Sequence, residues 1–320
     1  MIEAAGLTKR YGSVVAVDDL SFTIRPGVVT GFLGPNGAGK TTTMRLILGL
    51  DKPSAGTVTV GGKPYVQLRS PMREVGALLD ASAVHGGRSA RSHLLCMAQT
   101  NGIPGSRVDE VLGIVGLTDV AAKRTKTFSL GMSQRLGIAA ALLGDPRALM
   151  FDEPVNGLDP EGIRWIRTLV RSLAAEGRTV LVSSHLMSEM ENTADHLIVI
   201  GRGRLIADCG ISEFIAASQH QAVLVRTQQP GALRAAIASA GGTTSAATDA
   251  AGAAGEAAIE VRGLTEGQVA DLAFAHGIRL HHLSTSNVSL EQAFMELTAD
   301  SVEYRANPPG RPTAFNGTEA

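Results

Sequence analysis

The sequence has little cysteine, little net charge and no long apolar run, and each absence excludes some classes of protein. Cys96 and Cys209 are the only two cysteines in 320 residues. They lie far apart and without metal-ligand spacing, which favours buried thiols in a reducing compartment over a disulfide or redox pair. The formal net charge of -1 offers no general basic field for nucleic acid or an anionic membrane surface. Any anion site must therefore be local.

No apolar run reaches the roughly 20 residues that are needed to span a bilayer. Residues 1–4 show no basic region followed by an apolar core, as a secretion signal would require. These absences predict a cytoplasmic chain that would work at a membrane only through a membrane-embedded partner. A hydrophobic fraction of 44% with 18% charged residues is typical of a globular protein, and the length predicts about two domains.

The strongest motif is a glycine-rich stretch at residues 34–42 that satisfies the pattern G-x-x-x-x-G-K-[ST]. A short apolar run at 28–33 predicts a buried strand before it, and helical spacing of apolar residues at 43–48 predicts a helix after it. Glycines let backbone N–H groups face the β- and γ-phosphates of a nucleotide, and the helix N-terminus adds partial positive charge. The residues of this phosphate cradle are Gly34, Pro35, Asn36, Gly37, Ala38, Gly39, Lys40, Thr41 and Thr42. Lys40 would contact the β/γ oxygens, and the Thr41 hydroxyl would ligate Mg²⁺.

Two further predicted strands end in residues that suit the same chemistry. The apolar run at 148–151 is followed by Asp152 and Glu153, and the run at 179–183 leads to His185. Asp152 suits Mg²⁺ binding and Glu153 suits a general base that polarises water, whereas the alternative is a solvated acidic turn. A lone histidine after a strand is usually a polar loop residue, but at the same strand ends as Asp152 it could contact a γ-phosphate.

Two more candidates each have a plain and a functional interpretation. Residues 88–144 predict an α-helical insertion, in which Ser129 precedes a helix that contains Leu136 and Ile138. Ser129 is either a simple N-cap or part of a second anion-binding helix end. Tyr11 lies near an N-terminal sheet layer, which the alternation of apolar and polar residues at 20–25 predicts. It is either a packed turn residue or a platform that stacks on a planar base.

The order and spacing of these motifs over residues 2–212 resemble the nucleotide-binding subunit of an ATP-binding cassette (ABC) transporter. By this resemblance the functional residues are Tyr11 for stacking on the base, residues 34–42 as Walker A, Ser129 and Gly131 in the signature sequence, Asp152 and Glu153 as the Walker B acids, Asp159 in the D-loop and His185 as the switch histidine. The family implies an α/β P-loop NTPase fold with an antiparallel β layer and a helical subdomain. It also implies that two subunits sandwich two ATP molecules, each held by the cradle of one and the Ser129 helix end of the other.

The sequence departs from the family pattern in two places. The signature reads F-S-L-G-M instead of L-S-G-G-Q, so Leu130 and Met132 replace a glycine and a glutamine, while Ser129 and Gly131 remain. We expect function with altered fine contacts. Asp80 stands where most members have the Q-loop glutamine. It can still ligate Mg²⁺ or hold water, but it lacks amide donors and reaches less far. This form of the loop resembles the drug and peptide-antibiotic exporters with separate permease chains.

After the predicted ATPase domain at 1–212, with its helical subdomain at about 88–144, the pattern predicts a small α+β domain at 213–299. Its expected strands lie at 222–225, 258–261 and 278–283, its helices at 232–240 and 269–274, and a flexible small-residue loop at 241–255. A last helix would contain Leu290, Phe294 and Leu297, in an ending at 288–298 that resembles the C-terminal extension of the same exporters. The tail at 300–320 is predicted to be disordered.

The resemblance predicts an ATPase that dimerises around two MgATP and drives a membrane permease, which exports a drug, antibiotic or lipid-like compound. The expected partners are this separate permease and a second nucleotide-binding subunit in an ATP-dependent homodimer, with no nucleic acid. The chain would then lie on the inner face of the cell membrane. The alternative is a soluble ABC-type switch in regulation or ribosome function. One cassette and no basic stretch for RNA count against it.

Overall fold

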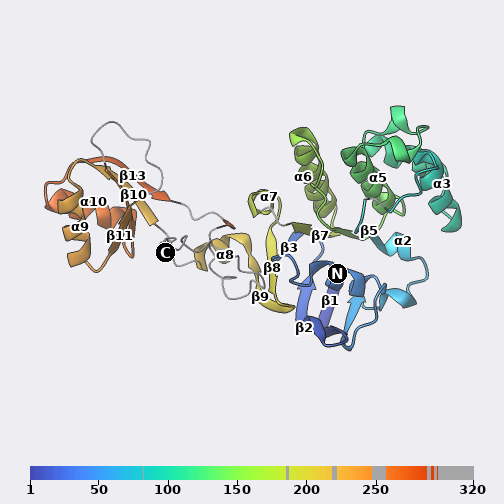
Figure 1. The fold of residues 1–320 in the computed structure, drawn as a ribbon, viewed down its shortest axis with the longest axis horizontal. Coiled ribbons are helices and arrows are strands. Elements are labelled where there is room, and N and C mark those ends of the chain that lie inside the picture. Colours follow the sequence, from blue (N-terminus) through green and yellow to red (C-terminus); the bar gives the residue numbers. More distant parts are fainter. Residues whose placement is uncertain are drawn as a thin grey trace, which may run out of the picture.

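The computed structural model describes residues 1–81, 83–184, 187–217, 222–246, 257–286, 290–291 and 294 (Figure 1). The first sheet is antiparallel, in the strand order β2-β1-β4. Its strands are β1 (Ile2–Tyr11), β2 (Val14–Ile24) and β4 (Ala55–Val60). Leu20, Phe22 and Ile24 of β2 are buried, which confirms the N-terminal layer that their alternation predicts.

The second sheet has six strands in the order β5-β6-β7-β3-β8-β9. Its strands are β3 (Val29–Leu33), β5 (Val75–Leu78), β6 (Ala148–Phe151), β7 (Thr179–Ser184), β8 (His196–Gly201) and β9 (Arg204–Gly210). All neighbouring pairs are parallel except β8 with β9, which form an antiparallel hairpin. Every residue of β3, β6 and β7 is buried, which explains their continuous apolar sequences. Because the strands are parallel, their carboxyl ends lie at one edge of the sheet.

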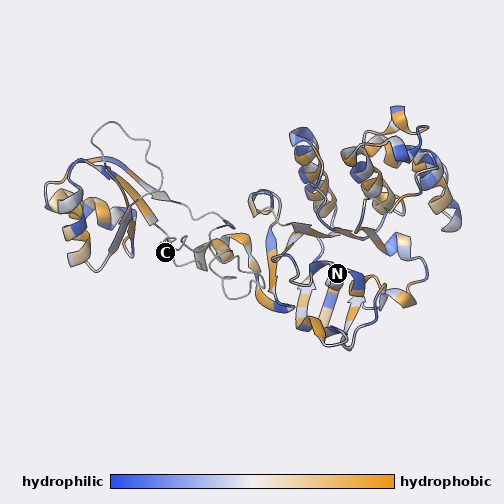
Figure 2. Ribbon diagram, viewed as in Figure 1, coloured by the Kyte–Doolittle hydropathy of each residue, from blue (hydrophilic) through white to orange (hydrophobic). Residues whose placement is uncertain are grey.

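Helices follow the strands of this sheet, and three of them form a separate group. The helices are α1 (Lys40–Ile47), α2 (Pro71–Glu74), α3 (Ala90–Thr100), α4 (Ser106–Ile114), α5 (Leu130–Leu142), α6 (Pro160–Ala175), α7 (Met187–Glu191) and α8 (Ile211–Ala217). Short 3₁₀ turns occur at Tyr65–Gln67, Thr118–Val120 and Thr125–Thr127. Helices α3, α4 and α5 contact one another and form the helical insertion that the sequence predicts. Polar and apolar residues share α6 (Figure 2), as expected of a helix with one face against a sheet. Among the described residues, no helix has the length and apolar character to cross a membrane.

The third sheet is antiparallel, in the order β11-β12-β10-β13. It contains β10 (Ala222–Thr227), β11 (Thr243–Ala246), β12 (Ala257–Arg262) and β13 (Leu280–Ser286), with helices α9 (Pro230–Ser239) and α10 (Glu266–Ala275). These elements confirm the predicted α+β composition. The prediction of a loop throughout 241–255 is wrong at β11, whose residues pair with 259–262 of β12. This pairing stabilises a strand in a sequence of small polar residues.

Residues from the end of the chain pack with the core of the six-stranded sheet. Phe214 of α8, Leu290 and Phe294 are all buried in the same apolar cluster as β6 and β7. The Leu290 N–H also donates a hydrogen bond to Glu191 Oε2 at 3.5 Å. Leu297 and the tail at 300–320 lie outside the described residues. The division of the chain at residue 212 stays a prediction.

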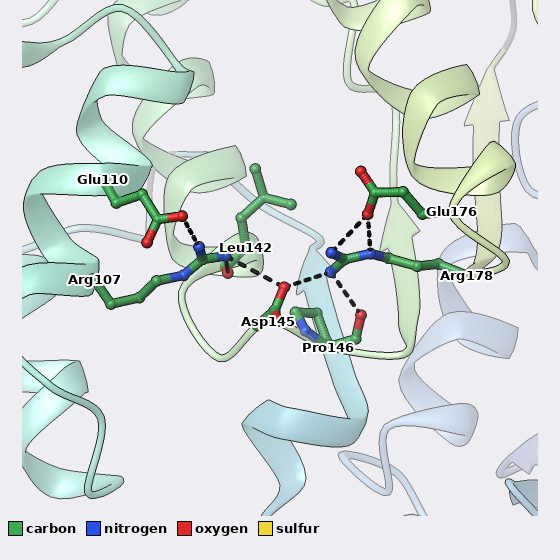
Figure 3. A network of polar contacts seen from close by, with 7 residues as sticks. All are labelled: Arg107, Glu110, Leu142, Asp145, Pro146, Glu176 and Arg178. Atoms are coloured by element: carbon green, nitrogen blue, oxygen red, sulfur yellow. Dashed lines mark hydrogen bonds and ion pairs between the residues drawn. The ribbon is translucent and has the colours of Figure 1, made fainter.

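An ion-pair network joins the helical insertion to the six-stranded sheet (Figure 3). Asp145, between α5 and β6, accepts from Arg178 NH1 at 2.8 Å and from Arg107 NH2 at 3.5 Å. The outer members of the network are Glu110 and Leu142, which bind Arg107, and Pro146 and Glu176, which bind Arg178. Asp145 has a φ of 51°, in the left-handed region that Asp and Asn tolerate better than other non-glycine residues. Asp145 therefore both shapes the turn and connects α4 to the start of β7.

We expect Asp145→Ala to lower the free energy of unfolding by about 1–2 kcal/mol, since alanine is strained at this φ and makes neither ion pair. Asp145→Asn tolerates the same φ and should cost only about 0.5 kcal/mol. Urea unfolding of both variants measures the difference. Equal losses of unfolding free energy in the two variants would show that backbone strain at residue 145 contributes nothing to the effect of the alanine.

Candidate active site

The predicted phosphate cradle is the loop between β3 and α1. Lys40 is 7% exposed, and its ammonium donates to the carbonyl oxygens of Gly34 at 2.6 Å and Pro35 at 3.3 Å. Gly39 has a φ of 102°, and a Cβ there would collide with the Ala16 carbonyl oxygen. Glycine is therefore required where the loop meets the helix. A cavity of about 280 Å³ is lined by residues 36–42 together with Ala16, Asp152 and Glu153.

The electrostatics of this cavity are set by Lys40 and two carboxylates. Burial lowers the pKa of Lys40, while Glu153 and Asp152 act in the opposite direction and favour its charged form. A buried cation beside backbone N–H groups at a helix N-terminus suits a multiply charged anion. The arrangement therefore matches a polyphosphate.

Asp152 is held by hydroxyl groups from two different elements. Thr41 Oγ1, in the first turn of α1, donates to Asp152 Oδ2 at 2.7 Å, and the Ser183 hydroxyl of β7 donates to Asp152 Oδ1. A threonine hydroxyl and a carboxylate within hydrogen-bond distance are hard oxygen ligands of the type that Mg²⁺ prefers. These residues fit that cation, and the solvated acidic turn is not what the structure shows.

Glu153 follows at the rim of the same cavity and has an unusual backbone. Its φ is 50°. Its N–H donates to Ser183 Oγ at 3.0 Å, and its carbonyl oxygen accepts from Gln134 Nε2 of α5 at 3.1 Å. Ser183 and Gln134 are not among the residues that the sequence motifs predict. The available signals are a serine near the end of an apolar strand and an amide side chain on the face of α5 that buries Ile138 and Ala141.

Three predicted residues lie elsewhere or cannot be placed. Tyr11 is not among the described residues that line the cavity, and its hydroxyl donates to Asp51 Oδ2 at 3.0 Å. Asp80 follows β5, next to β6, at the edge of the sheet where Asp152 lies, but it is also not among the described lining residues. His185 lies outside the described residues. The roles of these three residues stay predictions.

The predicted signature and D-loop residues begin helices. Ser129 is the N-cap of α5, where its Oγ accepts from Met132 N at 3.2 Å, and Asp159 is the N-cap of α6, where Oδ1 accepts from Gly162 N at 2.8 Å. Ser129 therefore caps α5, as both the plain and the anion-binding interpretation require, and its role at a second anion site stays a prediction. Gly131 lies close to Gly157, since a Cβ at 131 would be 3.0 Å from the Gly157 carbonyl oxygen. Ser129, Gly131 and Asp159 are absent from the described lining of the cradle cavity.

Comparisons with known proteins decide the family. A family model described as ABC transporter matches residues 17–156, an AAA domain model matches 122–191, and a domain of unknown function matches 221–291. The bacitracin transport ATP-binding protein BcrA of Bacillus licheniformis is 41% identical over 241 residues, 71% of this chain and 79% of that protein. The uncharacterized ABC transporter ATP-binding protein YhcH of Bacillus subtilis (strain 168) is 36% identical over 306 residues, 95% of this chain and 97% of that protein. The chain belongs to the ABC transporter ATP-binding proteins.

As an ABC ATP-binding subunit, the chain binds and hydrolyses ATP. Its fold agrees with the solved dimeric structure of a bacterial ABC transporter cassette, with a TM-score of 0.61 at 23% identity over 66% of this chain and 99% of that one. The predicted family and the P-loop fold with its antiparallel layer and helical subdomain are confirmed.

The unusual Leu130 of this ABC subunit has a structural counterpart at Gly157, in the predicted D-loop. Leu130 is 63% exposed, and its side chain lies over Gly157. Gly157 has a φ of 74°, and a Cβ there would overlap the Leu130 side chain. A side chain at 157 would therefore force the Leu130 side chain to shift from this position.

We expect Gly157→Ala to lower the free energy of unfolding by about 2–4 kcal/mol, through left-handed strain of about 1–2 kcal/mol and overlap with Leu130. Adding Leu130→Ala to Gly157→Ala removes the overlap. The double variant should then recover the part of the unfolding free energy that the overlap cost and keep only the loss from backbone strain. A double-mutant cycle by urea unfolding measures this coupling. Additive losses would contradict the steric pairing.

Proposed function

We propose that this ABC subunit drives an exporter, in which two copies sandwich two MgATP and a separate permease carries a drug, antibiotic or lipid-like compound. The observation that carries the proposal is the meeting of Lys40, the Thr41–Asp152 pair and Glu153 in one cavity. The 41% identity to a bacitracin transport protein supports an antibiotic as the cargo. The same likeness to transport subunits favours transport over a soluble switch. The chain would then sit on the inner face of the cell membrane through the permease.

In this proposal the cradle N–H groups and Lys40 bind the β- and γ-phosphates. Thr41 and Asp152 would hold Mg²⁺, with Asp80 as a further ligand or a holder of water. Mg²⁺ held by these residues would supply positive charge that neutralises the phosphates. Ser183 keeps the Asp152 carboxylate in place from β7. Tyr11 would stack on the base.

Glu153 acts as the general base, because it is the second carboxylate at the rim of the phosphate cavity. It orients the attacking water and accepts its proton as the water oxygen bonds to the γ-phosphorus, while the bond from the γ-phosphorus to the β-phosphate oxygen breaks and ADP leaves. His185 would contact the γ-phosphate from the end of β7. Since Lys40 lies in the same cavity, its charge opposes the negative charge that develops during transfer.

Ser129, Gly131 and Asp159 serve the second subunit in this proposal. They start helices α5 and α6, away from the described cradle lining of their own chain. The Ser129 helix end would contact the γ-phosphate held by the partner's cradle. The dimeric form of the related bacterial cassette supports this arrangement.

The proposed division of the chain is an ATPase domain at 1–212, a small domain at 213–299 and a tail at 300–320. The match of a separate family model to residues 221–291 supports a distinct second unit. Phe214, Leu290 and Phe294 belong to the proposed small domain by sequence, but their side chains are buried in the core of the first unit.

Loss of the base in Glu153→Gln should slow hydrolysis by roughly 10²- to 10⁴-fold and leave ATP binding intact. The variant should also accumulate as a dimer with MgATP, whereas the wild type returns to monomer. Light scattering and phosphate release measure both effects in the full chain. Glu213→Gln, the same change at an exposed site on α8, is the matched control. A Glu153→Gln variant that hydrolyses ATP at the wild-type rate would contradict this role.

Removing the proposed metal ligand in Thr41→Ala should raise the Mg²⁺ concentration needed for half-maximal hydrolysis by about 10-fold or more, as losses at metal sites do. Thr41→Ser keeps the hydroxyl and should restore the wild-type requirement. A Mg²⁺ titration of phosphate release compares the three proteins. An unchanged midpoint in Thr41→Ala would remove Thr41 from the metal site.

A further inference from the structure

Gln134 of α5 is a buried polar residue. Among the described residues, its side chain has one hydrogen-bond partner. It is 5% exposed, on a helix face whose other buried members include Ile138 and Ala141. Its Nε2 donates to the Glu153 carbonyl oxygen at 3.1 Å. A buried amide is costly without hydrogen bonds, so this contact is a specific feature of the packing and constrains both partners.

Glu153 needs such a constraint because its backbone is in the left-handed region, with a φ of 50°. Each of its backbone polar groups has a buried side-chain partner, and its carbonyl oxygen also accepts from the Asn156 N–H at 3.2 Å. Ser183 Oγ accepts from its N–H at 3.0 Å, and Gln134 donates to its carbonyl. The orientation of residue 153 is therefore fixed from β7 on one side and from α5 on the other.

Helix α5 is in turn fixed to its neighbours by the next residue. Arg135 NH1 donates to the Val115 carbonyl oxygen at 3.0 Å, and its guanidinium lies 4.5 Å from the centre of the Trp165 ring of α6. The first turn of the same helix carries Gly131 and is capped by Ser129. Gln134 lies about one and a half turns from Ser129. Because the helix is rigid over this length, a displacement of the start of α5 also displaces Gln134.

We propose that Gln134 is a positioning residue, whose amide holds the backbone of Glu153 and couples the start of α5 to the general base of the same chain. This inference rests on the proposed role of Glu153. When the Ser129 end of α5 engages a nucleotide, the helix and the carbonyl of Glu153 move together, so that the carboxylate is correctly placed only in the closed assembly.

Gln134→Met removes the amide and keeps the length of the side chain. In the full chain at saturating MgATP, we expect the single-turnover rate of hydrolysis to fall about 10-fold, the effect of one lost hydrogen bond. The dissociation constant for ATP should change less than about twofold, since Gln134 does not line the cavity. Ile138→Val, a buried change on the same helix that removes no hydrogen bond, should keep the wild-type rate.

The double variant Gln134→Met with Glu153→Gln separates positioning from a general structural role. If Gln134 acts through the Glu153 carboxylate, the double variant hydrolyses ATP no more slowly than Glu153→Gln alone. If the loss is structural, Gln134→Met slows both backgrounds by the same factor, and the proposal is overturned.

A wild-type rate in Gln134→Met together with a slow Glu153→Gln would overturn the positioning role and leave the ATPase mechanism standing. A wild-type rate in Glu153→Gln would instead remove Glu153 as the base. Circular dichroism checks that Gln134→Met is folded. If it is not, Gln134→Asn, which keeps an amide on a shorter side chain, must show the same loss of rate, and a folded Gln134→Asn with the wild-type rate would contradict the proposal.

Discussion

The hydrogen bond from Thr41 to Asp152 joins the first turn of α1 to the end of β6, and the geometry of the site depends on it. The order of the parallel sheet makes this contact possible, because β7 lies between β3 and β6 and supplies Ser183 to the same carboxylate. Three chain segments that are far apart in sequence thereby share one acidic group. A cation at this point would neutralise the charge of a carboxylate whose position two hydroxyl groups already fix.

The cradle, the buried strands and the acids after β6 could be predicted because each signal is local: glycine spacing, an apolar run, or a polar residue that ends it. Ser183 and Gln134 could not, because their roles depend on which strand and helix lie next to Glu153, and no local pattern gives that register. For the same reason the sequence identifies Tyr11 as an aromatic candidate but does not show that its hydroxyl binds Asp51.

In the small C-terminal unit, too, some strands follow from the local sequence and one depends on its tertiary contacts. Short segments rich in apolar residues predict β10 and β12, whereas the small polar residues of β11 form a strand only by pairing with β12. The departure at Leu130 is a similar case, since the sequence shows an unusual residue while only the fold shows that it covers Gly157. Substitutions in the signature and in the D-loop are therefore expected to be coupled.

The burial of Leu290 and Phe294 beside Phe214 has a consequence for biosynthesis. The ribosome releases the chain in order, so strands β10 to β13 emerge before these two residues do. The smaller sheet can therefore fold while the apolar cluster of the larger one is still incomplete. The six-stranded sheet is synthesised first, but its apolar cluster is completed only after Leu290 and Phe294 have emerged. A nascent chain arrested before residue 290 would expose that cluster to chaperones.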